Sequence, residues 1–153
     1  VPGGSTLPAG GPQSEVPYVL ELVRAGGLDV MTLSPPMRRL QLVPGPGADA
    51  VLTAPVGRAF QPELFDAWLP EPVLKNSISR TAFEVSWSAG SIRFTVRGSN
   101  TLLVDGQRTE RGVAVPLQVG SEVTFLNNST GAAFLSLRLI SSAAGQAAST
   151  SPP

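Results

Sequence analysis

Alternation of apolar and polar residues with a period of two runs through much of the chain between residues 18 and 140, and it constrains the fold more than any other feature. The stretch 82–87 alternates in this way, and after an Ala-Gly pair the stretch 91–97 alternates again. Successive side chains of a strand point to opposite faces of a sheet, so an alternating stretch buries one face and exposes the other. The two stretches therefore predict a β-hairpin.

The same pattern predicts further short strands. Stretches 122–125 and 135–139 alternate on either side of a turn at 127–131, which predicts a second hairpin. Earlier runs of similar length are separated by Gly-Gly, Pro-Pro and Pro-Gly signals, and they are 18–24, 28–33, 39–43 and 50–56. Short strands with frequent turns and one polar face predict an all-β fold, an antiparallel sandwich of two twisted sheets.

One short helix is expected, over residues 62–68 within the long connection 59–78. Pro62 suits the first position of a helix, and prolines at 70 and 72 follow its end. Phe65, Trp68 and Leu69 of this connection either fold back onto the sandwich, which we expect, or form an apolar anchor for a partner.

Composition separates the chain into three parts. Residues 1–17 are rich in Gly and Pro and are expected to be a flexible linker, and residues 141–153 are expected to be a flexible tail rich in Ala, Ser and Pro. Residues 18–140 are expected to be the globular domain. The valine at position 1 suggests a piece excised from a longer protein.

Charge and residue content exclude several classes of function. The 153 residues hold 11 basic and 11 acidic side chains, so we expect neither nucleic acid nor a membrane surface as a partner. The chain has no Cys and no His, which removes thiolate nucleophiles, imidazole bases and nearly all zinc sites. We expect no cofactor, no metal and no catalytic residue. Without a secretory signal pattern, we expect an intracellular protein, nuclear or cytoplasmic.

Hydroxyl, amide and guanidinium side chains occur in three connections between the predicted strands. Gly57-Arg58 follows one strand, Ser79-Arg80 precedes the next, and Ser99-Asn100 comes after the hairpin. Arginine offers a planar fork of donors that matches phosphate oxygens, and each charge-assisted bond contributes roughly 1.5–3 kcal/mol. These connections are therefore candidates for an oxyanion-binding site.

Four motifs in this order resemble the forkhead-associated (FHA) domain. They are Gly57-Arg58 and the stretches 79–85, 99–106 and 117–123, and the resemblance covers roughly residues 18–140. In that family a Gly-Arg pair, a Ser-Arg-x-His stretch, a Ser-Asn-Gly-Thr loop and a Leu-x-x-Gly-Asp-x-Ile stretch follow one another. The resemblance implies an FHA/SMAD-like sandwich of about eleven strands. It also implies a phosphothreonine-binding module of a larger signalling or regulatory protein, not an enzyme.

The resemblance assigns a role to each residue of the candidate site. Arg58 matches the arginine that pairs with the phosphate, Ser79 the serine that hydrogen-bonds it, and Arg80 would add a contact. Ser99 matches a position that reaches the phosphate. Asn100 matches the asparagine that holds the main chain of the bound peptide. The implied partner is a phosphorylated protein or peptide. Oligomeric state is left open.

The chain departs from the family pattern at three positions. Ala82 stands where the family has the His that buttresses the binding loops, and Thr101 and Leu102 replace Gly and Thr. Threonine is costly where the backbone needs a positive φ, so the loop carrying Asn100 is expected to follow another path.

Ordinary structural roles remain open for these residues. Arg58 can end a strand with its head in water, and Ser79, Ser99 and Asn100 are common turn residues. A second class of function therefore stands beside the first: an FHA-like scaffold or dimerisation module that binds its partner independently of phosphorylation. An enzyme fits least, because the acids at 63, 66 and 71 lie on one connection with no evident partner.

Overall fold

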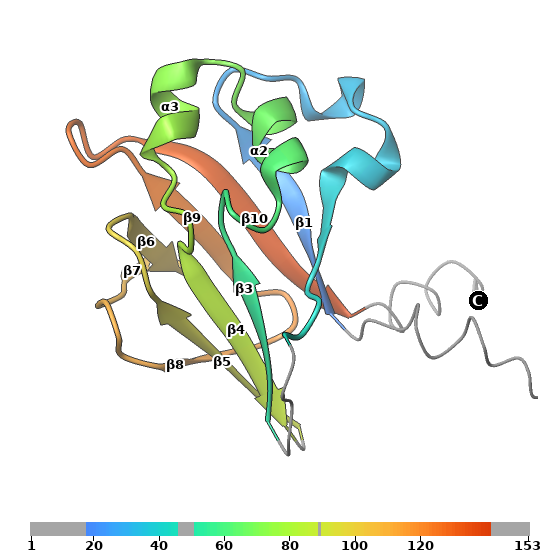
Figure 1. Ribbon diagram of the computed structural model, residues 1–153, viewed down its shortest axis with the longest axis vertical. Coiled ribbons are helices and arrows are strands. Elements are labelled where there is room, and N and C mark those ends of the chain that lie inside the picture. The colour runs from blue at the N-terminus through green and yellow to red at the C-terminus, as the bar shows by residue number, and fades with distance from the viewer. Residues whose placement is uncertain (1–17, 46–50, 89, 142–153) are drawn as a thin grey trace, which may run out of the picture.

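The computed structural model describes residues 18–45, 51–88 and 90–141. Within them the chain forms a sandwich of a six-stranded and a four-stranded sheet, and every pair of neighbouring strands in either sheet is antiparallel (Figure 1). The predicted all-β sandwich is confirmed. The predicted linker 1–17 and residues 142–153 of the predicted tail lie outside the described residues.

The six-stranded sheet brings together the first and the last strands of the domain. Its spatial order is β2-β1-β10-β9-β6-β7. Its strands are β1 (Tyr18–Ala25), β2 (Arg39–Gln41), β6 (Thr101–Val104), β7 (Gln107–Arg108), β9 (Glu122–Leu126) and β10 (Ala133–Ser141). The predicted second hairpin is confirmed, since β9 pairs with β10 from Leu126↔Ala133 to Glu122↔Arg138.

The four-stranded sheet is built around the other predicted hairpin, in the order β3-β4-β5-β8. Its strands are β3 (Leu52–Val56), β4 (Phe83–Ser88), β5 (Ser91–Val96) and β8 (Val115–Leu117). The pairing of β4 with β5 runs from Phe83↔Val96 to Ser88↔Ser91, which confirms the first hairpin. The predicted run 39–43 contains the shorter strand β2, whereas the strand β8 was not predicted.

Aromatic and aliphatic side chains from the two sheets meet in one core. Phe83 and Phe94 of the four-stranded sheet have ring centroids 4.8 Å apart, and Phe83 lies 6.1 Å from Phe125 of the other sheet. All three rings are fully buried. The alternation in sequence is thus the alternation between this core and solvent.

The predicted strand at 28–33 is wrong. Here the chain forms a 3₁₀ turn, η1 (Val30–Thr32), followed by a second, η2 (Pro35–Arg38). The side chain of Asp29 accepts a hydrogen bond from the Met31 amide at 3.1 Å, and the Thr32 hydroxyl donates to the Asp29 carbonyl at 2.7 Å. Short polar side chains that bond nearby backbone compete with strand pairing, and at this position they prevail.

The connection between β3 and β4 contains two helices instead of the one expected. The predicted helix is confirmed as α2 (Pro62–Trp68), and it is followed by α3 (Pro72–Ser77). We took Pro72 as a stop signal after α2, whereas it occupies the start of the next helix. Both helices lie over one end of the sandwich (Figure 1).

Phe65, Trp68 and Leu69 fold back onto the sandwich, as expected. Phe65 and Trp68 are fully buried and Leu69 is nearly so. The indole nitrogen of Trp68 donates to the Met37 carbonyl at 2.7 Å, which ties α2 to η2. These side chains are therefore part of the core and are not available as an anchor for a partner.

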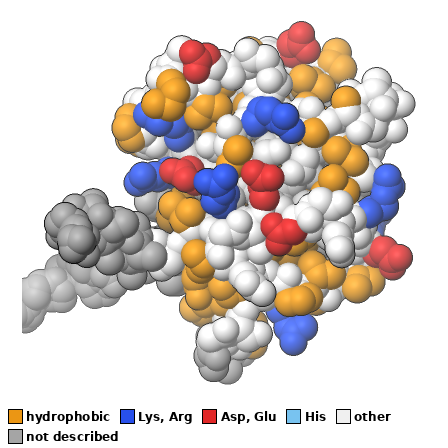
Figure 2. All heavy atoms as spheres, turned by 180° about the vertical axis from the view of Figure 1, so that it is seen from behind, with side chains coloured by type: hydrophobic (Ala, Val, Ile, Leu, Met, Phe, Trp, Pro, Cys, Tyr) orange, Lys and Arg blue, Asp and Glu red, His pale blue; other side chains and the backbone are white. Residues whose placement is uncertain are grey.

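Charged side chains are spread over the surface of the domain. Figure 2 shows acidic and basic groups interspersed with apolar ones over the face seen there, in keeping with the balanced charge of the sequence. No helix in the described part of the chain is long and apolar enough to cross a bilayer.

Candidate functional site

The residues of the candidate site lie at the end of the sandwich that the two helices cover. Because neighbouring strands are antiparallel, the end of β3, the start of β4 and the end of β5 lie at the same end of their sheet. In the other sheet, β6 begins opposite the end of β9. Hydrogen bonds between these connections bring residues from 57 to 128 into one cluster.

Arg58 is half-buried at the exit from β3. Its side-chain Nε donates to the Ile78 carbonyl at 2.6 Å, and its backbone amide donates to the Ser79 carbonyl at 3.2 Å. Neither of the ion pairs in the described part of the chain includes Arg58; they join Lys75 to Asp66 and Arg97 to Glu84. The guanidinium is thus oriented by a main-chain oxygen and its charge is not neutralised by a paired carboxylate.

Ser79 and Ser99 are in direct contact. The Ser79 hydroxyl accepts a hydrogen bond from the Ser99 amide at 3.0 Å, and the two hydroxyl oxygens lie 3.4 Å apart. The connections that carry Ser79 and Ser99 therefore meet at this point.

Asn100 is buried and its amide group is used within the protein. Its Oδ1 accepts from the Ser79 amide at 2.8 Å, and its Nδ2 donates to the Ser77 carbonyl at 2.7 Å. Its side chain is only 6% exposed. We assigned this residue to the main chain of a bound peptide, whereas here it holds the main chain of the β3–β4 connection.

Arg80 is exposed beside this cluster. Its carbonyl accepts from the Ala59 amide at 3.1 Å, so its backbone helps to join the end of β3 to the start of β4. Its side chain forms no hydrogen bond or ion pair within the described ranges. Arg80 directly follows Ser79 in the chain, and solvent reaches its guanidinium.

Two glycines allow the loops to approach one another. A Cβ at Gly57 would overlap the Arg80 carbonyl and the Thr81 Cα, and a Cβ at Gly98 would overlap the Ser79 side chain. Any larger residue would push the β3–β4 connection away from its neighbours. The contact between Ser79 and Ser99 therefore requires glycine at positions 57 and 98.

Asn128, from the β9–β10 turn, is a member of the cluster that the sequence did not reveal. Its Nδ2 donates to the Ser99 carbonyl at 3.0 Å, and its Oδ1 accepts from the Thr101 amide at 3.2 Å. We had assigned it only to a turn. Ser77, Ser79, Ser99, Asn100 and Asn128 together form a continuous chain of hydrogen bonds, which we call the loop network.

The three positions that depart from the family pattern lie in or beside the strands of the sandwich. Thr101 begins β6 and its backbone is extended, and Asp105 is the one described residue other than Gly with a positive φ. Ala82 and Leu102 are fully buried. The Ala82 carbonyl accepts from the amides of Arg97 and Gly98 at 2.9 and 3.1 Å, so position 82 supports the loops through its backbone.

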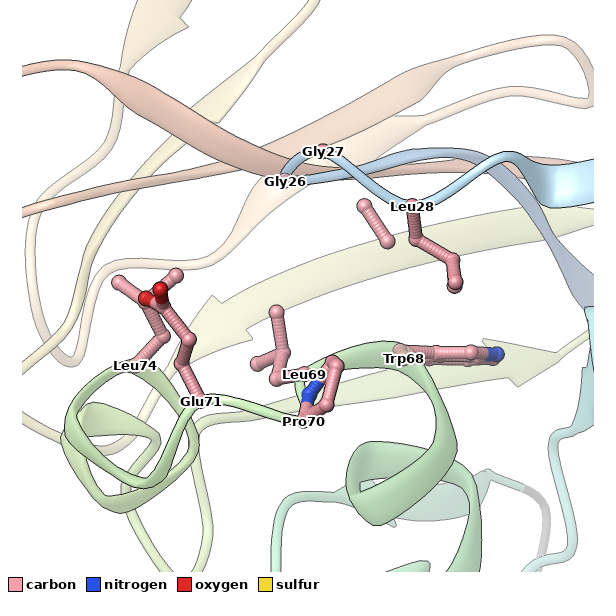
Figure 3. Close-up of a pocket in the computed structure, with 9 residues that line it drawn as sticks. Gly26, Gly27, Leu28, Trp68, Leu69, Pro70, Glu71 and Leu74 are labelled. Atoms are coloured by element: carbon pink, nitrogen blue, oxygen red, sulfur yellow. The ribbon is translucent and has the colours of Figure 1, made fainter.

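Two of the surface depressions beside the helices differ in their lining. One of about 230 Å³ is lined by Arg58 and by residues of α2 and α3, namely Pro62, Phe65, Asp66, Lys75 and Asn76. The other, of about 370 Å³, lies between the turn after β1 and the link from α2 to α3 (Figure 3). Trp68, Leu69 and Leu74 give it a largely apolar lining, and Glu71 adds a carboxylate, so it is unsuited to an oxyanion.

The cluster is suited to binding an anion. Arg58 supplies charge, and the hydroxyls of Ser79 and Ser99 supply neutral donors in the connections that its backbone adjoins. Within the described residues, no group of three or more His, Cys, Asp or Glu side chains lies close enough to hold a metal ion.

Comparisons with known proteins identify the fold. No protein-family model and no curated protein matches the chain. Among solved structures, an engineered FHA domain with a Myc-pTBD peptide is 16% identical, with a TM-score of 0.54 over 82% of this chain and 91% of that one. The N-terminal FHA domain of S. cerevisiae Rad53p, solved with a phosphothreonine peptide, is 14% identical, with a TM-score of 0.51 over 84% and 97%. The chain therefore has the fold of an FHA domain.

Proposed function

We propose that this chain is a phosphothreonine-binding interaction module of a larger signalling or regulatory protein, that it acts inside the cell, and that it is not an enzyme. The observation that carries the proposal is Arg58, whose Nε donates to the Ile78 carbonyl and which takes part in neither ion pair of the described residues. The paired hydroxyls of Ser79 and Ser99 belong to the same group of loops. The similar FHA structures that contain phosphothreonine or other peptides support the same proposal.

A second candidate is a scaffold that binds its partner without regard to phosphorylation. The burial of Asn100 favours it, because both ends of that amide are engaged by the β3–β4 connection. The loops are then held for their shape and not for a ligand. This candidate predicts equal affinity for phosphorylated and unphosphorylated forms of the same peptide.

Fluorescence anisotropy with matched threonine and phosphothreonine peptide libraries separates the two candidates. We expect binding of phosphorylated members only, and Arg58→Ala to weaken it by about tenfold to a hundredfold, the loss of one or more charge-assisted bonds at roughly 1.5–3 kcal/mol each. Arg93→Ala is the matched control, since Arg93 is an exposed arginine on β5. Binding that ignores the phosphate, or equal losses in Arg58→Ala and Arg93→Ala, would refute the proposal.

A further inference from the structure

A second cation borders the depression beside Arg58. Lys75, in the last turn of α3, lines that depression together with Arg58. The two residues are joined through the backbone, because the Lys75 carbonyl accepts from the Ile78 amide at 3.1 Å and the Ile78 carbonyl accepts from Arg58 Nε at 2.6 Å. The helix that was not expected from the sequence thus brings an ammonium group to the depression that Arg58 lines.

Asp66 of α2 is paired with this lysine. Its Oδ1 lies 3.0 Å from Lys75 Nζ, and the Asp66 side chain is 60% exposed while that of Lys75 is 34% exposed. An ion pair with this much access to water contributes little to folding. A doubly charged phosphate or another anionic group can therefore replace the carboxylate at small cost.

We propose that Lys75 is a second anion-binding residue of this surface, and that Asp66 competes with the ligand for it. This inference rests on the proposed function and adds a residue to it. The anionic oxygens come either from the phosphothreonine phosphate or from an acidic side chain next to it. In both cases removal of Asp66 strengthens binding, because it frees Lys75 and removes a negative charge from the edge of the depression.

Variants of Asp66 and Lys75 test this competition. Competition predicts that peptide affinity rises when Asp66 is replaced, whereas a purely structural ion pair predicts no such rise. We expect Asp66→Asn to tighten binding of a phosphothreonine peptide by roughly threefold, the size of a partly exposed charge interaction. Adding Lys75→Met to Asp66→Asn should reverse the gain and lower affinity below that of the wild type. Glu122→Gln is the charge-matched control, because Glu122 lies at the opposite end of β9 from the Asn128 turn.

The peptides distinguish the two sources of charge. The two peptides carry either alanine or glutamate next to the phosphothreonine. If Asp66→Asn raises affinity equally for both, Lys75 binds the phosphate. If it raises affinity only for the glutamate peptide, Lys75 binds the glutamate side chain. Asp66→Asn that behaves like Glu122→Gln with both peptides would overturn the proposal.

A titration with inorganic phosphate separates this inference from the proposed function. We expect the side-chain NMR signals of Arg58 and Lys75 to shift with one common saturation curve in the wild-type chain. Shifts at both residues, without any preference for phosphorylated peptides, would refute the proposed function and retain the anion site. Shifts at Arg58 alone would exclude the phosphate as the ligand of Lys75. Together with an Asp66→Asn variant that behaves like Glu122→Gln, they would overturn the role of Lys75 and leave the proposed function standing.

Discussion

Replacement of Asn100 by alanine tests whether the loop network holds the site together. The substitution removes hydrogen bonds to the Ser79 amide at 2.8 Å and the Ser77 carbonyl at 2.7 Å. Each such bond contributes about 0.5–1.5 kcal/mol net, so we expect the free energy of unfolding to fall by about 2 kcal/mol. With a urea dependence of about 1–3 kcal/mol per molar, the unfolding midpoint should fall by about 1 M.

Urea unfolding followed by tryptophan fluorescence measures this change, and Asn76→Ala is the matched control. Asn76 is exposed on α3 and its side chain forms no hydrogen bond in the described part of the chain. Its replacement should alter stability by less than about 0.5 kcal/mol. Equal midpoints for Asn100→Ala and Asn76→Ala would refute the structural role of Asn100.

Hydrogen exchange at one amide makes the test specific. In Asn100→Ala the Ser79 amide loses its acceptor, so its exchange should accelerate beyond what the loss of global stability explains. Asn100→Asp retains an oxygen at this position and lacks the donor to the Ser77 carbonyl. It should therefore lower stability while keeping the Ser79 amide protected, and unprotected exchange in Asn100→Asp would contradict the assigned geometry.

The other predictions concern loop spacing, the hydrophobic core and pH. Gly57→Ala should destabilise the fold by about 1–3 kcal/mol and weaken peptide binding, because its methyl group overlaps the Arg80 carbonyl; unchanged unfolding and anisotropy curves would contradict this. Trp68→Phe should lower stability by about 1–3 kcal/mol in urea unfolding, through the lost bond to Met37 and the space left in the core. Phosphopeptide affinity should fall as pH drops from about 7 to 5, because the phosphate takes up a proton near its second pKa of about 6 and the chain has no His. A phosphonate peptide with a lower second pKa should shift the midpoint of this profile downward, and an unchanged midpoint would assign it to a protein group.

Local signals account for the elements that the sequence predicted. The hairpins follow from alternation that each strand carries by itself. The start of α2 follows from Pro62 in the same way. These features depend on residues close together in the chain, so a single sequence contains the information.

Features that depend on competition or on distant contacts were not predictable in this way. Pro72 is equally compatible with a position after the end of one helix and with the first position of another. Only the packing of the β3–β4 connection decides that a helix begins there. Asn128 forms hydrogen bonds with Thr101 and Ser99, which lie 27 and 29 positions earlier in the chain. Its local sequence therefore indicates no more than a turn. The candidate site was therefore predictable in its motif residues and not in the side chains that position them.

The loop network explains how this chain positions the donors of the candidate site. At Ala82 the support from the core is a methyl group and a carbonyl that accepts from two amides of the β5–β6 loop. The remaining support comes from the side, where Asn100 holds the β3–β4 connection and Asn128 holds the loop that carries Ser99. Each asparagine makes one bond as donor and one as acceptor, so loss of either releases two backbone groups at once. Asn100 and Asn128 therefore hold these loops from the side, and the alignment of Ser79 with Ser99 depends on them.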